Sequence, residues 1–450
     1  MSSMQLLPYK QQVSSLLRLG LPIVVGQLGM IILGLADTIM IGHHSTEELA
    51  AAAFVNNVFN LAIIFATGFS YGLTPLIGML QGGGNTQGIG RVFRNALAAN
   101  ASVAVLLTAV MYTVYCFVDK LGQPEELLPH IRPYFVLQLI SLLFIMLFNG
   151  FRQFAEGLTD TRTPMWILLG GNALNIFGNY LLIYGSFGFP EWGLFGAGVS
   201  TLVSRIVMLL VFIGVVAVAR RYKVYREAIL RSRFNRNDFI QLNALGWPIA
   251  LQMGMETAAF SLSAIMVGWL VSIPLAAHQI MISVSTIGFM VYYGMGAALA
   301  VRVSHFMGQK DFPNLRRAVN SGMGIILSLA IVASLFFYLV RTPIIYSFTE
   351  DHEVMIVVSS LIFSLIVYQF GDALQITFAN ALRGTTDVKP MMWIAFFSYF
   401  IVALPVGYLC GFTWGGGVVG VWVAFPAGLF TAGFLFWLRF RYRLQQLMKK

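Results

Sequence analysis

Residues 19–42 read LGLPIVVGQLGMIILGLADTIMIG, an apolar run that contains one acid, Asp37. A run of about 20 apolar residues is long enough to cross a ~30 Å hydrocarbon core as an α-helix. Residues 245–268 read LGWPIALQMGMETAAFSLSAIMVG and repeat the first run, with Pro248 at the position of Pro22. The two stretches predict a helical membrane protein that contains an internal duplication.

The composition of the whole chain agrees with this class. Of its 450 residues, 58% are hydrophobic and 10% are charged, and the mean hydropathy is +0.78. A soluble protein carries about a quarter charged residues. The short alternating apolar and polar segments of a membrane β-barrel are not found in the sequence. We therefore expect an all-α polytopic membrane protein.

Apolar stretches of spanning length recur along nearly the whole chain. We predict twelve spans: 16–42, 50–80, 93–118, 131–154, 163–185, 193–219, 243–269, 275–304, 318–340, 354–381, 389–411 and 417–438. If both termini are cytoplasmic, 24 of the 28 Lys and Arg residues lie on the cytoplasmic side. Of the other four, Lys120, Arg132 and Arg341 lie outside, and Arg205 lies within a span. This distribution follows the positive-inside rule and predicts a multi-pass protein of the plasma (inner) membrane.

The densest basic run joins the sixth and seventh spans. Its bases are Arg220, Arg221, Lys223, Arg226, Arg231, Arg233 and Arg236. A cytoplasmic linker that touches anionic lipid headgroups explains this run better than a segment that binds nucleic acid. We therefore predict an N-terminal six-helix lobe (1–219), a basic cytoplasmic linker (220–240) and a C-terminal six-helix lobe with a cytoplasmic tail (241–450).

The internal duplication covers most of each half. The motif GLTD at 157–160 returns as GTTD at 384–387, and GLFGAGV at 193–199 returns as GVVGVWV at 417–423. Because six is an even number of spans, both halves cross the membrane in the same sense. A pseudo-twofold axis along the membrane normal is then expected to relate them. This geometry is typical of transporters that work by alternating access.

Three acids lie within the predicted spans: Asp37, Glu256 and Asp372. Each costs roughly 2.5–3.5 kcal/mol at mid-membrane, so a compensating use is expected. The duplication gives each acid a counterpart in the other half, and none of these counterparts is acidic: Ser263, Met30 and Ile145, respectively. The fold therefore does not require these carboxylates, which favours a functional role.

Amides accompany the acids at helical spacing. Gln252 shares a helix face with Glu256, and Gln369 and Gln375 flank Asp372. A third polar face carries Asn172, Asn175 and Asn179. Hydrogen bonding between helices is the other explanation for such amides. For Asn172 both explanations stay open, whereas the apolar counterparts of Asn175 and Asn179 favour a polar pocket.

Few basic groups are expected inside the membrane. For Arg205, pairing with an acid, a position toward the inner surface and a functional role all stay open. His278, followed by Gln279, is more typical of packing or hydrogen bonding than of a proton relay. Carboxylates and amides with few bases favour a positively charged cargo and coupling cations. The 37 Phe and 21 Met residues suit flat or apolar cations.

Several motifs, in order and in both halves, resemble the multidrug and toxic compound extrusion (MATE) transporters, and the NorM-like branch in particular. They are LGLPIVVGQ (19–27), GLADTIMIGH (34–43), LAAHQI (275–280), AVRVSHFMGQKD (300–311) and ALRGTTDVKP (381–390). The resemblance implies two six-helix lobes around a central cleft. It also implies export of organic cations and amphipathic drugs in exchange for sodium ions or protons, without another cofactor. We expect a monomer in contact with lipids and not with nucleic acid.

The resemblance also implies which residues bind ions. Asp37, Asn175 and Asn179 match the cation site of the family's N-terminal lobe, and Glu256 and Asp372 match the acids of the NorM-like C-terminal lobe. Either set is a candidate for Na⁺ or H⁺. The branch that relies on the N-terminal lobe carries an acid where this chain has Asn179, and this departure does not favour coupling to protons alone.

Three alternative functions lack the residues that they would need. A flippase of lipid-linked saccharide on the same fold would need several buried bases for the phosphates, but only Arg205 is expected within a span. A major-facilitator transporter would carry a charged motif after its second span, where this chain reads QGGGNTQGIGR (81–91). An intramembrane enzyme would need clustered catalytic groups or a metal set, but the six histidines are scattered. We therefore expect a transporter and not an enzyme.

Overall fold

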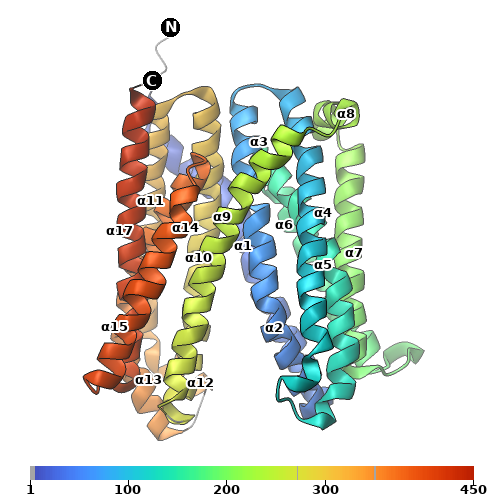
Figure 1. Ribbon diagram of the computed structural model, residues 1–450, viewed down its shortest axis with the longest axis vertical. Helices are drawn as coiled ribbons and strands as arrows, with labels where there is room; N and C mark the ends of the chain where they lie inside the picture. The colour runs from blue at the N-terminus through green and yellow to red at the C-terminus, as the bar shows by residue number, and fades with distance from the viewer. Residues whose placement is uncertain (1–5, 271, 349–350, 450) are drawn as a thin grey trace. The chain divides into compact units, whose positions relative to one another are not determined.

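The structure is a computed structural model that describes residues 6–270, 272–348 and 351–449 (Figure 1). Within these residues the regular structure is helical, and twelve segments are long and apolar enough to cross a membrane. The predicted fold class and the predicted number of spans are confirmed. The spans of the structure are Tyr9–His44, Thr46–Gly82, Thr86–Cys116, Glu125–Gly157, Arg162–Ile183, Gly193–Val218, Arg236–Gly268, Ser272–Gln309, Phe312–Leu339, His352–Gly384, Lys389–Thr413 and Gly417–Met448.

Contacts divide the chain into two compact units, Val25–Ala250 and Met1–Val24 with Leu251–Lys450. We call these the N-unit and the C-unit. The boundaries differ from the division predicted at 220–240, because they fall within two helices, α1 (Tyr9–His44) and α9 (Arg236–Gly268). The first part of α1 packs in the C-unit, and the first part of α9 packs in the N-unit. Helical periodicity in the sequence does not show such an exchange.

Glycines permit the close packing of both exchanged segments. In the N-unit, a Cβ added at Gly72 would lie 2.8 Å from the backbone nitrogen of Gly246 on α9. In the C-unit, a Cβ added at Gly294 would lie 2.9 Å from the backbone nitrogen of Val24 on α1. Backbone atoms cannot move aside as a flexible side chain can, so only glycine fits at these two positions.

The N-unit contains the remainder of α1 and the helices up to α9. In chain order they are α2 (Thr46–Ser70), α3 (Leu73–Gly82), α4 (Thr86–Cys116), η1 (Val118–Lys120), η2 (Glu125–Leu127), α5 (Leu128–Gly157), α6 (Arg162–Ile183), η3 (Ser186–Gly188), α7 (Gly193–Val218), η4 (Arg220–Tyr222) and α8 (Lys223–Arg231). Its second span is broken into α2 and α3 at Tyr71 and Gly72, next to the close contact with Gly246.

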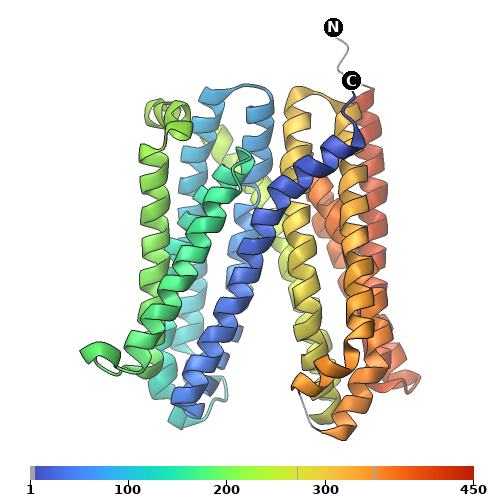
Figure 2. The same ribbon diagram turned by 180° about the vertical axis from the view of Figure 1, so that it is seen from behind.

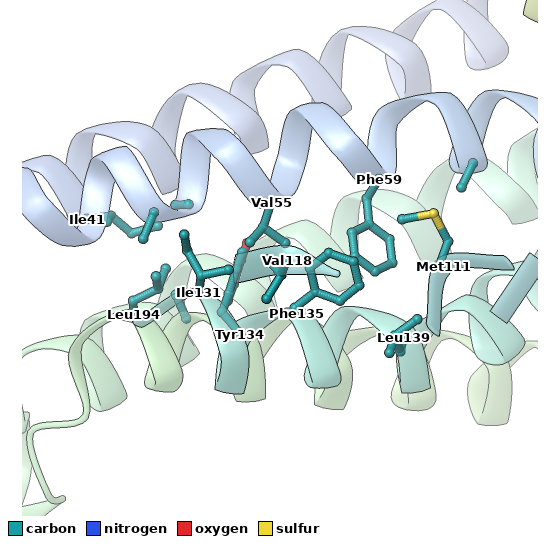
Figure 3. Packing of buried hydrophobic residues seen from close by; sticks show 14 of the residues in the cluster. Ile41, Val55, Phe59, Met111, Val118, Ile131, Tyr134, Phe135, Leu139 and Leu194 are labelled. Carbon is teal, nitrogen blue, oxygen red and sulfur yellow. The ribbon is translucent and has the colours of Figure 1, made fainter. Parts of the chain in front are cut away.

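A buried apolar cluster holds the outer helices of the N-unit together (Figure 3). At its centre, Phe59 on α2 meets Phe135 on α5 edge to face, with ring centroids 4.7 Å apart. Ile41 on α1 and Leu194 on α7 extend the cluster to two more helices. Aromatic pairs of this kind contribute about 0.5–1.5 kcal/mol beyond the burial of their area. The cluster therefore fixes α1, the helix that carries Asp37, in place beside α2, α5 and α7.

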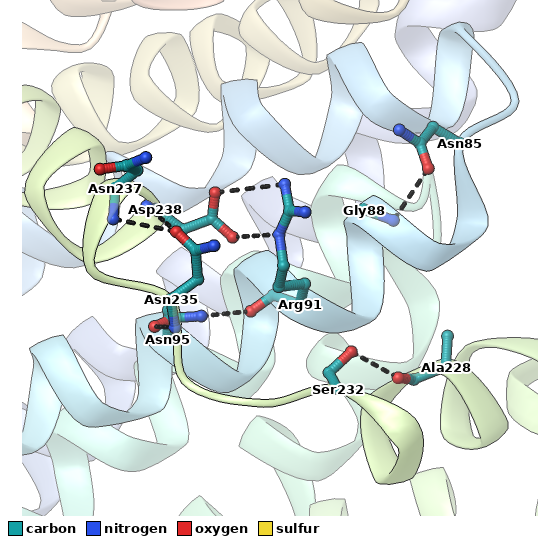
Figure 4. A network of polar contacts seen from close by, with 9 residues as sticks. All are labelled: Asn85, Gly88, Arg91, Asn95, Ala228, Ser232, Asn235, Asn237 and Asp238. Atoms are coloured by element: carbon teal, nitrogen blue, oxygen red, sulfur yellow. Dashed lines mark hydrogen bonds and ion pairs between the residues drawn. The ribbon is translucent and has the colours of Figure 1, made fainter.

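The basic segment 220–240 is attached to the N-unit by specific polar contacts (Figure 4). Arg91 on α4 forms an ion pair with Asp238 at 2.6 Å, and the backbone nitrogen of Asn235 donates to Asn95 Oδ1 at 3.0 Å. Helix α8 packs so tightly on α4 that a Cβ added at Gly90 would lie 2.5 Å from the backbone of Ala228. The predicted linker is therefore an ordered part of this unit.

A buried tyrosine anchors the start of the same segment. The Tyr222 hydroxyl donates to Asp160 Oδ2 at 2.7 Å, and Arg221 pairs with the same oxygen at 3.1 Å. Burial, reinforced by the Asp160 carboxylate, raises the pKa of Tyr222 above its usual value. The hydroxyl therefore keeps its proton and remains a donor across the physiological pH range.

The C-unit contains the first part of α1, the remainder of α9 and ten further elements (Figure 2). They are α10 (Ser272–Gln309), α11 (Phe312–Leu339), α12 (Arg341–Phe348), α13 (His352–Gly384), α14 (Lys389–Phe396), η5 (Phe397–Ala403), α15 (Leu404–Tyr408), η6 (Leu409–Thr413), α16 (Gly417–Trp422) and α17 (Ala424–Met448). The eleventh span alternates α-helix with two π-helical segments, η5 and η6. Such widened turns are frequent near functional sites.

The packing of Gly72 leads to a first prediction. Gly72→Ala places a methyl group against the Gly246 backbone, and we expect a lower apparent unfolding temperature of the purified protein in one detergent. Gly214→Ala, in the same unit, is the control: among the described residues, no atom beyond the local helix backbone lies within 4 Å of its Cβ position. Alanine is favoured over glycine in a helix by about 0.5–1 kcal/mol. Equal stability of the two variants would contradict the inferred contact.

Candidate ion and substrate sites

The three residues predicted for an N-terminal site lie together in the N-unit. Asn179 on α6 donates from Nδ2 to Asp37 Oδ1 on α1 at 2.6 Å. The Asn175 amide is oriented so that its hydrogen bonds match its neighbours: Asn175 Nδ2 donates to Asp37 Oδ1 at 3.0 Å. Asn175 Oδ1 then accepts from the Thr201 backbone nitrogen at 3.2 Å and from Thr201 Oγ1 at 3.1 Å. Both asparagines are buried, and Asn179 Oδ1 has no hydrogen-bond partner among the described residues.

A cavity of about 130 Å³ adjoins these residues. It is lined by Leu33, Asp37, Asn56, Tyr134, Gln138, Gly171, Asn172, Asn175, Thr201, Ser204, Arg205 and Met208. A cavity needs about 10–15 Å³ of such volume to hold one water, so this one has room for several. It is therefore suited to an ion or to one polar group of a larger molecule. Asn172 belongs to this cavity, which favours the pocket explanation for it.

The cavity also contains the base whose role the sequence left open. Arg205 on α7 donates from Nη1 to Gln138 Oε1 at 3.1 Å and to Ser141 Oγ on α5. No carboxylate lies within ion-pair distance of its guanidinium in the described part of the chain. Arg205 thus shares the cavity of Asp37 without a direct pair with an acid.

In the C-unit, Glu256 is the centre of a hydrogen-bonded network. Its Oε2 accepts from Gln252 Nε2 at 2.9 Å on the same helix, α9, and from Gln375 Nε2 at 3.1 Å on α13. Arg383 on α13 donates from Nη2 to Gln252 Oε1 at 2.8 Å. Gln252 therefore connects a guanidinium to the Glu256 carboxylate through its two amide atoms.

Asp372 lies on α13 one turn before Gln375. It is 1% exposed, and neither carboxylate oxygen has a hydrogen-bond partner among the described residues. Gln369, one turn earlier, is fully buried and also has an unpartnered amide. A Cβ added at Gly288 on α10 would lie 2.8 Å from Gln369 Oε1, so this glycine makes room for the amide. A run of buried polar groups without partners follows this face of α13.

Two supporting candidates lie outside these networks. The indole of Trp422 donates to His278 Nδ1 at 3.1 Å, and the His278 ring stacks on Phe425 at 6.1 Å between centroids. His278 is thus a hydrogen-bonded member of an aromatic cluster. Gln279, the next residue on α10, is exposed.

Sequence reasoning missed Arg383, because hydropathy places it at the cytoplasmic end of the tenth span. The structure buries it, with 5% of its surface exposed. A signal was available: the GLTD and GTTD alignment places Arg383 opposite Glu156, an exchange of charge between the halves. A change from an acid to a base at equivalent positions of the two halves is not needed for packing. It indicates that the charges around these positions differ between the halves.

Two repeats of six spanning segments, each with buried carboxylates and amides, define a polytopic membrane transporter. A family model described as MatE matches residues 22–181 and 248–409, one match in each repeat. The chain belongs to this family, the MATE multidrug efflux transporters, as the sequence motifs predicted.

Curated and solved relatives agree with this assignment. The multidrug resistance protein NorM of Photobacterium profundum is 30% identical over 448 residues, which cover 96% of each chain. An outward-facing multidrug resistance MATE transporter has a TM-score of 0.88 at 20% identity and covers 99% of this chain and 100% of its own. A eukaryotic MATE transporter has a TM-score of 0.86 at 16% identity and covers 98% and 99%, respectively. These structures show that the fold is shared.

The Gln252 bridge leads to a second prediction. Gln252→Leu removes a donor from Glu256 and an acceptor from Arg383, and the loss of hydrogen bonds to charged groups costs about 1–3 kcal/mol each. We expect a lower apparent unfolding temperature of the purified protein. Gln279→Leu makes the same chemical change at an exposed position on α10 and should leave stability unreduced. A wild-type value for Gln252→Leu would show that the bridge does not stabilise the unit.

Proposed function

We propose that the protein is a secondary active antiporter that exports organic cations and amphipathic drugs in exchange for sodium ions or protons by alternating access. The observation that carries this proposal is Asp372, a buried carboxylate without a hydrogen-bond donor among the described residues. An ionised carboxylate in such surroundings is very unfavourable unless it is paired. A proton, a sodium ion or a cationic drug would each supply the missing partner.

Glu256 and Asp372 form the proposed acidic site of the C-unit. Gln375 hydrogen-bonds to Glu256 and lies one turn after Asp372 on α13, which places Asp372 beside the network of Glu256. Gln375 Oε1 and both Gln369 amide atoms have no hydrogen-bond partner in the described part of the chain. Carboxylate and amide oxygens are the ligands that hard cations prefer. The set therefore suits Na⁺ as well as H⁺.

The N-unit supplies a second proposed site at Asp37, Asn175 and Asn179. Two amide groups donate to Asp37 Oδ1, and the unpartnered Asn179 Oδ1 adds an amide oxygen beside the carboxylate. The adjacent cavity of about 130 Å³ has room for a cation with a few waters beside Asp37.

The mechanism rests on competition for the carboxylates. A ligand shifts the equilibrium between outward-facing and inward-facing states only by its difference in affinity for the two. A cation that enters from outside neutralises an acid and weakens the hold on a cationic drug, which leaves outward. Inward movement of one positive charge releases about 2.3 kcal/mol per 100 mV of membrane potential. The membrane potential drives export only where more positive charge enters than leaves with the drug, so its contribution depends on the charge of the cargo.

The relative named as a multidrug resistance protein supports drugs as the cargo. The excess of Lys and Arg in the predicted cytoplasmic connections supports a location in the plasma membrane with both termini inside. In this membrane we propose a monomer whose partners are lipids and small cationic or amphipathic molecules, and not nucleic acid.

Transport by charge-neutral variants is the third prediction. Asp37→Asn, Glu256→Gln and Asp372→Asn each remove a negative charge with little change in shape. We expect at least one to lower ethidium export by about tenfold or more in proteoliposomes with an imposed sodium or proton gradient, because a charged partner contributes about 1.5–3 kcal/mol. The two gradients, applied separately, identify the coupling ion.

The control is Glu47→Gln, which makes the same chemical change at an exposed position. Its export rate should equal that of the wild type. Undiminished export in all three site variants under both gradients would refute the proposed role of the carboxylates.

A further inference from the structure

The cavity of the N-unit has a side that the cation site does not use. Three residues that line it carry hydrogen-bond donors: Arg205, Asn172 and Ser204. Asn172 is 8% exposed and Ser204 is 3% exposed, and neither Asn172 Nδ2 nor Ser204 Oγ has a hydrogen-bond partner among the described residues. Buried polar groups are rarely left without a partner. Three donors around one cavity call for a ligand that accepts hydrogen bonds.

The charge of Arg205 strengthens this requirement. Its two hydrogen bonds both use Nη1 and both end on neutral acceptors, Gln138 and Ser141. Ser141 in turn donates its proton to the Gln138 carbonyl at 2.8 Å, so its oxygen is committed as an acceptor toward Arg205. A guanidinium has five N–H donors, so Nε and Nη2 remain for a ligand. The contacts hold Arg205 at the cavity but do not neutralise it.

We propose that Arg205, Asn172 and Ser204 form a binding subsite for a small anionic group. The group is either a free inorganic anion or the carboxylate of an organic molecule. Both accept charge-assisted hydrogen bonds from a guanidinium and ordinary ones from the amide and hydroxyl. The volume of about 130 Å³ has room for a monatomic anion with a few waters or for one carboxylate group.

Asp37 sets the affinity of this subsite, because it lines the same cavity with the opposite charge. Its negative charge opposes an anion at Arg205. A cation bound to Asp37 cancels that opposition, so the anion and the cation favour each other's binding. Such a coupling is reciprocal by thermodynamic necessity. The anion subsite itself does not depend on drug export or on the identity of the coupling ion.

Anion binding to the purified full-length protein in lipid nanodiscs tests the proposal, and this is the fourth prediction. A ligand that binds the folded state raises the apparent unfolding temperature in a saturable way. The probes are chloride and benzoate, each replacing isethionate at constant pH, sodium concentration and ionic strength. Saturation by chloride alone identifies an inorganic-anion site, saturation by benzoate alone identifies a carboxylate site, and saturation by both identifies their shared chemistry.

The variants assign the effect to the subsite. Arg205→Gln should weaken the binding of the effective probe by about tenfold or more, because the charge-assisted hydrogen bonds are lost. Asp37→Asn should strengthen it. Arg132→Gln removes an exposed base of the same unit and should leave it unchanged. If Arg205→Gln does not fold, Ser204→Ala removes one donor with little loss of volume and should also weaken binding.

Two results would overturn the proposal. One is the absence of saturable binding of either probe to the wild-type protein. The other is wild-type affinity in the folded Arg205→Gln variant, or in Ser204→Ala where that variant does not fold. Neither result bears on drug export, which is measured separately with the carboxylate variants.

Discussion

The hydrocarbon core offers no hydrogen-bond partner to a peptide group, and this constraint determines most of the structure. Each backbone N–H and C=O must be satisfied within the protein, which leaves the helix as the solution for every span of this chain. Where the chain departs from regular helix, another part of the protein is close by. The break between α2 and α3 lies against the Gly246 backbone, and the π-helical turns of the eleventh span pack on α16 and α17.

The same constraint governs the buried charges, and the two repeats meet it differently at equivalent positions. In the N-unit, Arg152 pairs with Glu156 at 2.7 Å one turn away, and both side chains are buried. In the C-unit, the position of Glu156 holds Arg383, and alanine stands where the N-unit has Arg152. Arg383 donates to Gln252, which hydrogen-bonds to Glu256. An ion pair within one helix of the first repeat thus corresponds to a hydrogen-bonded network between two helices in the second.

Hydropathy, charge and duplication were enough to predict the class and the number of spans, whereas the grouping of Asp37 with Asn175 and Asn179 came from the family resemblance. They were not enough to predict neighbours that depend on which helices meet. Arg383 looked cytoplasmic because it lies at the end of an apolar run, and α8 has too few apolar residues to register as a span. The exchange of the first parts of α1 and α9 was also missed, because a straight helical pattern continues through Val24 and Ala250.

The two proposed sites differ in net charge and therefore in the ligands that they would bind. In the N-unit cavity, Arg205 offsets the charge of Asp37, so the cavity is neutral without a ligand. In the C-unit, Glu256 accepts a hydrogen bond from Gln252, and Gln252 accepts one from Arg383. Asp372, with no donor among the described residues, is left with the uncompensated charge. A cation or a proton is therefore needed more at the C-unit acids, whereas the N-unit cavity can bind a cation and an anion together.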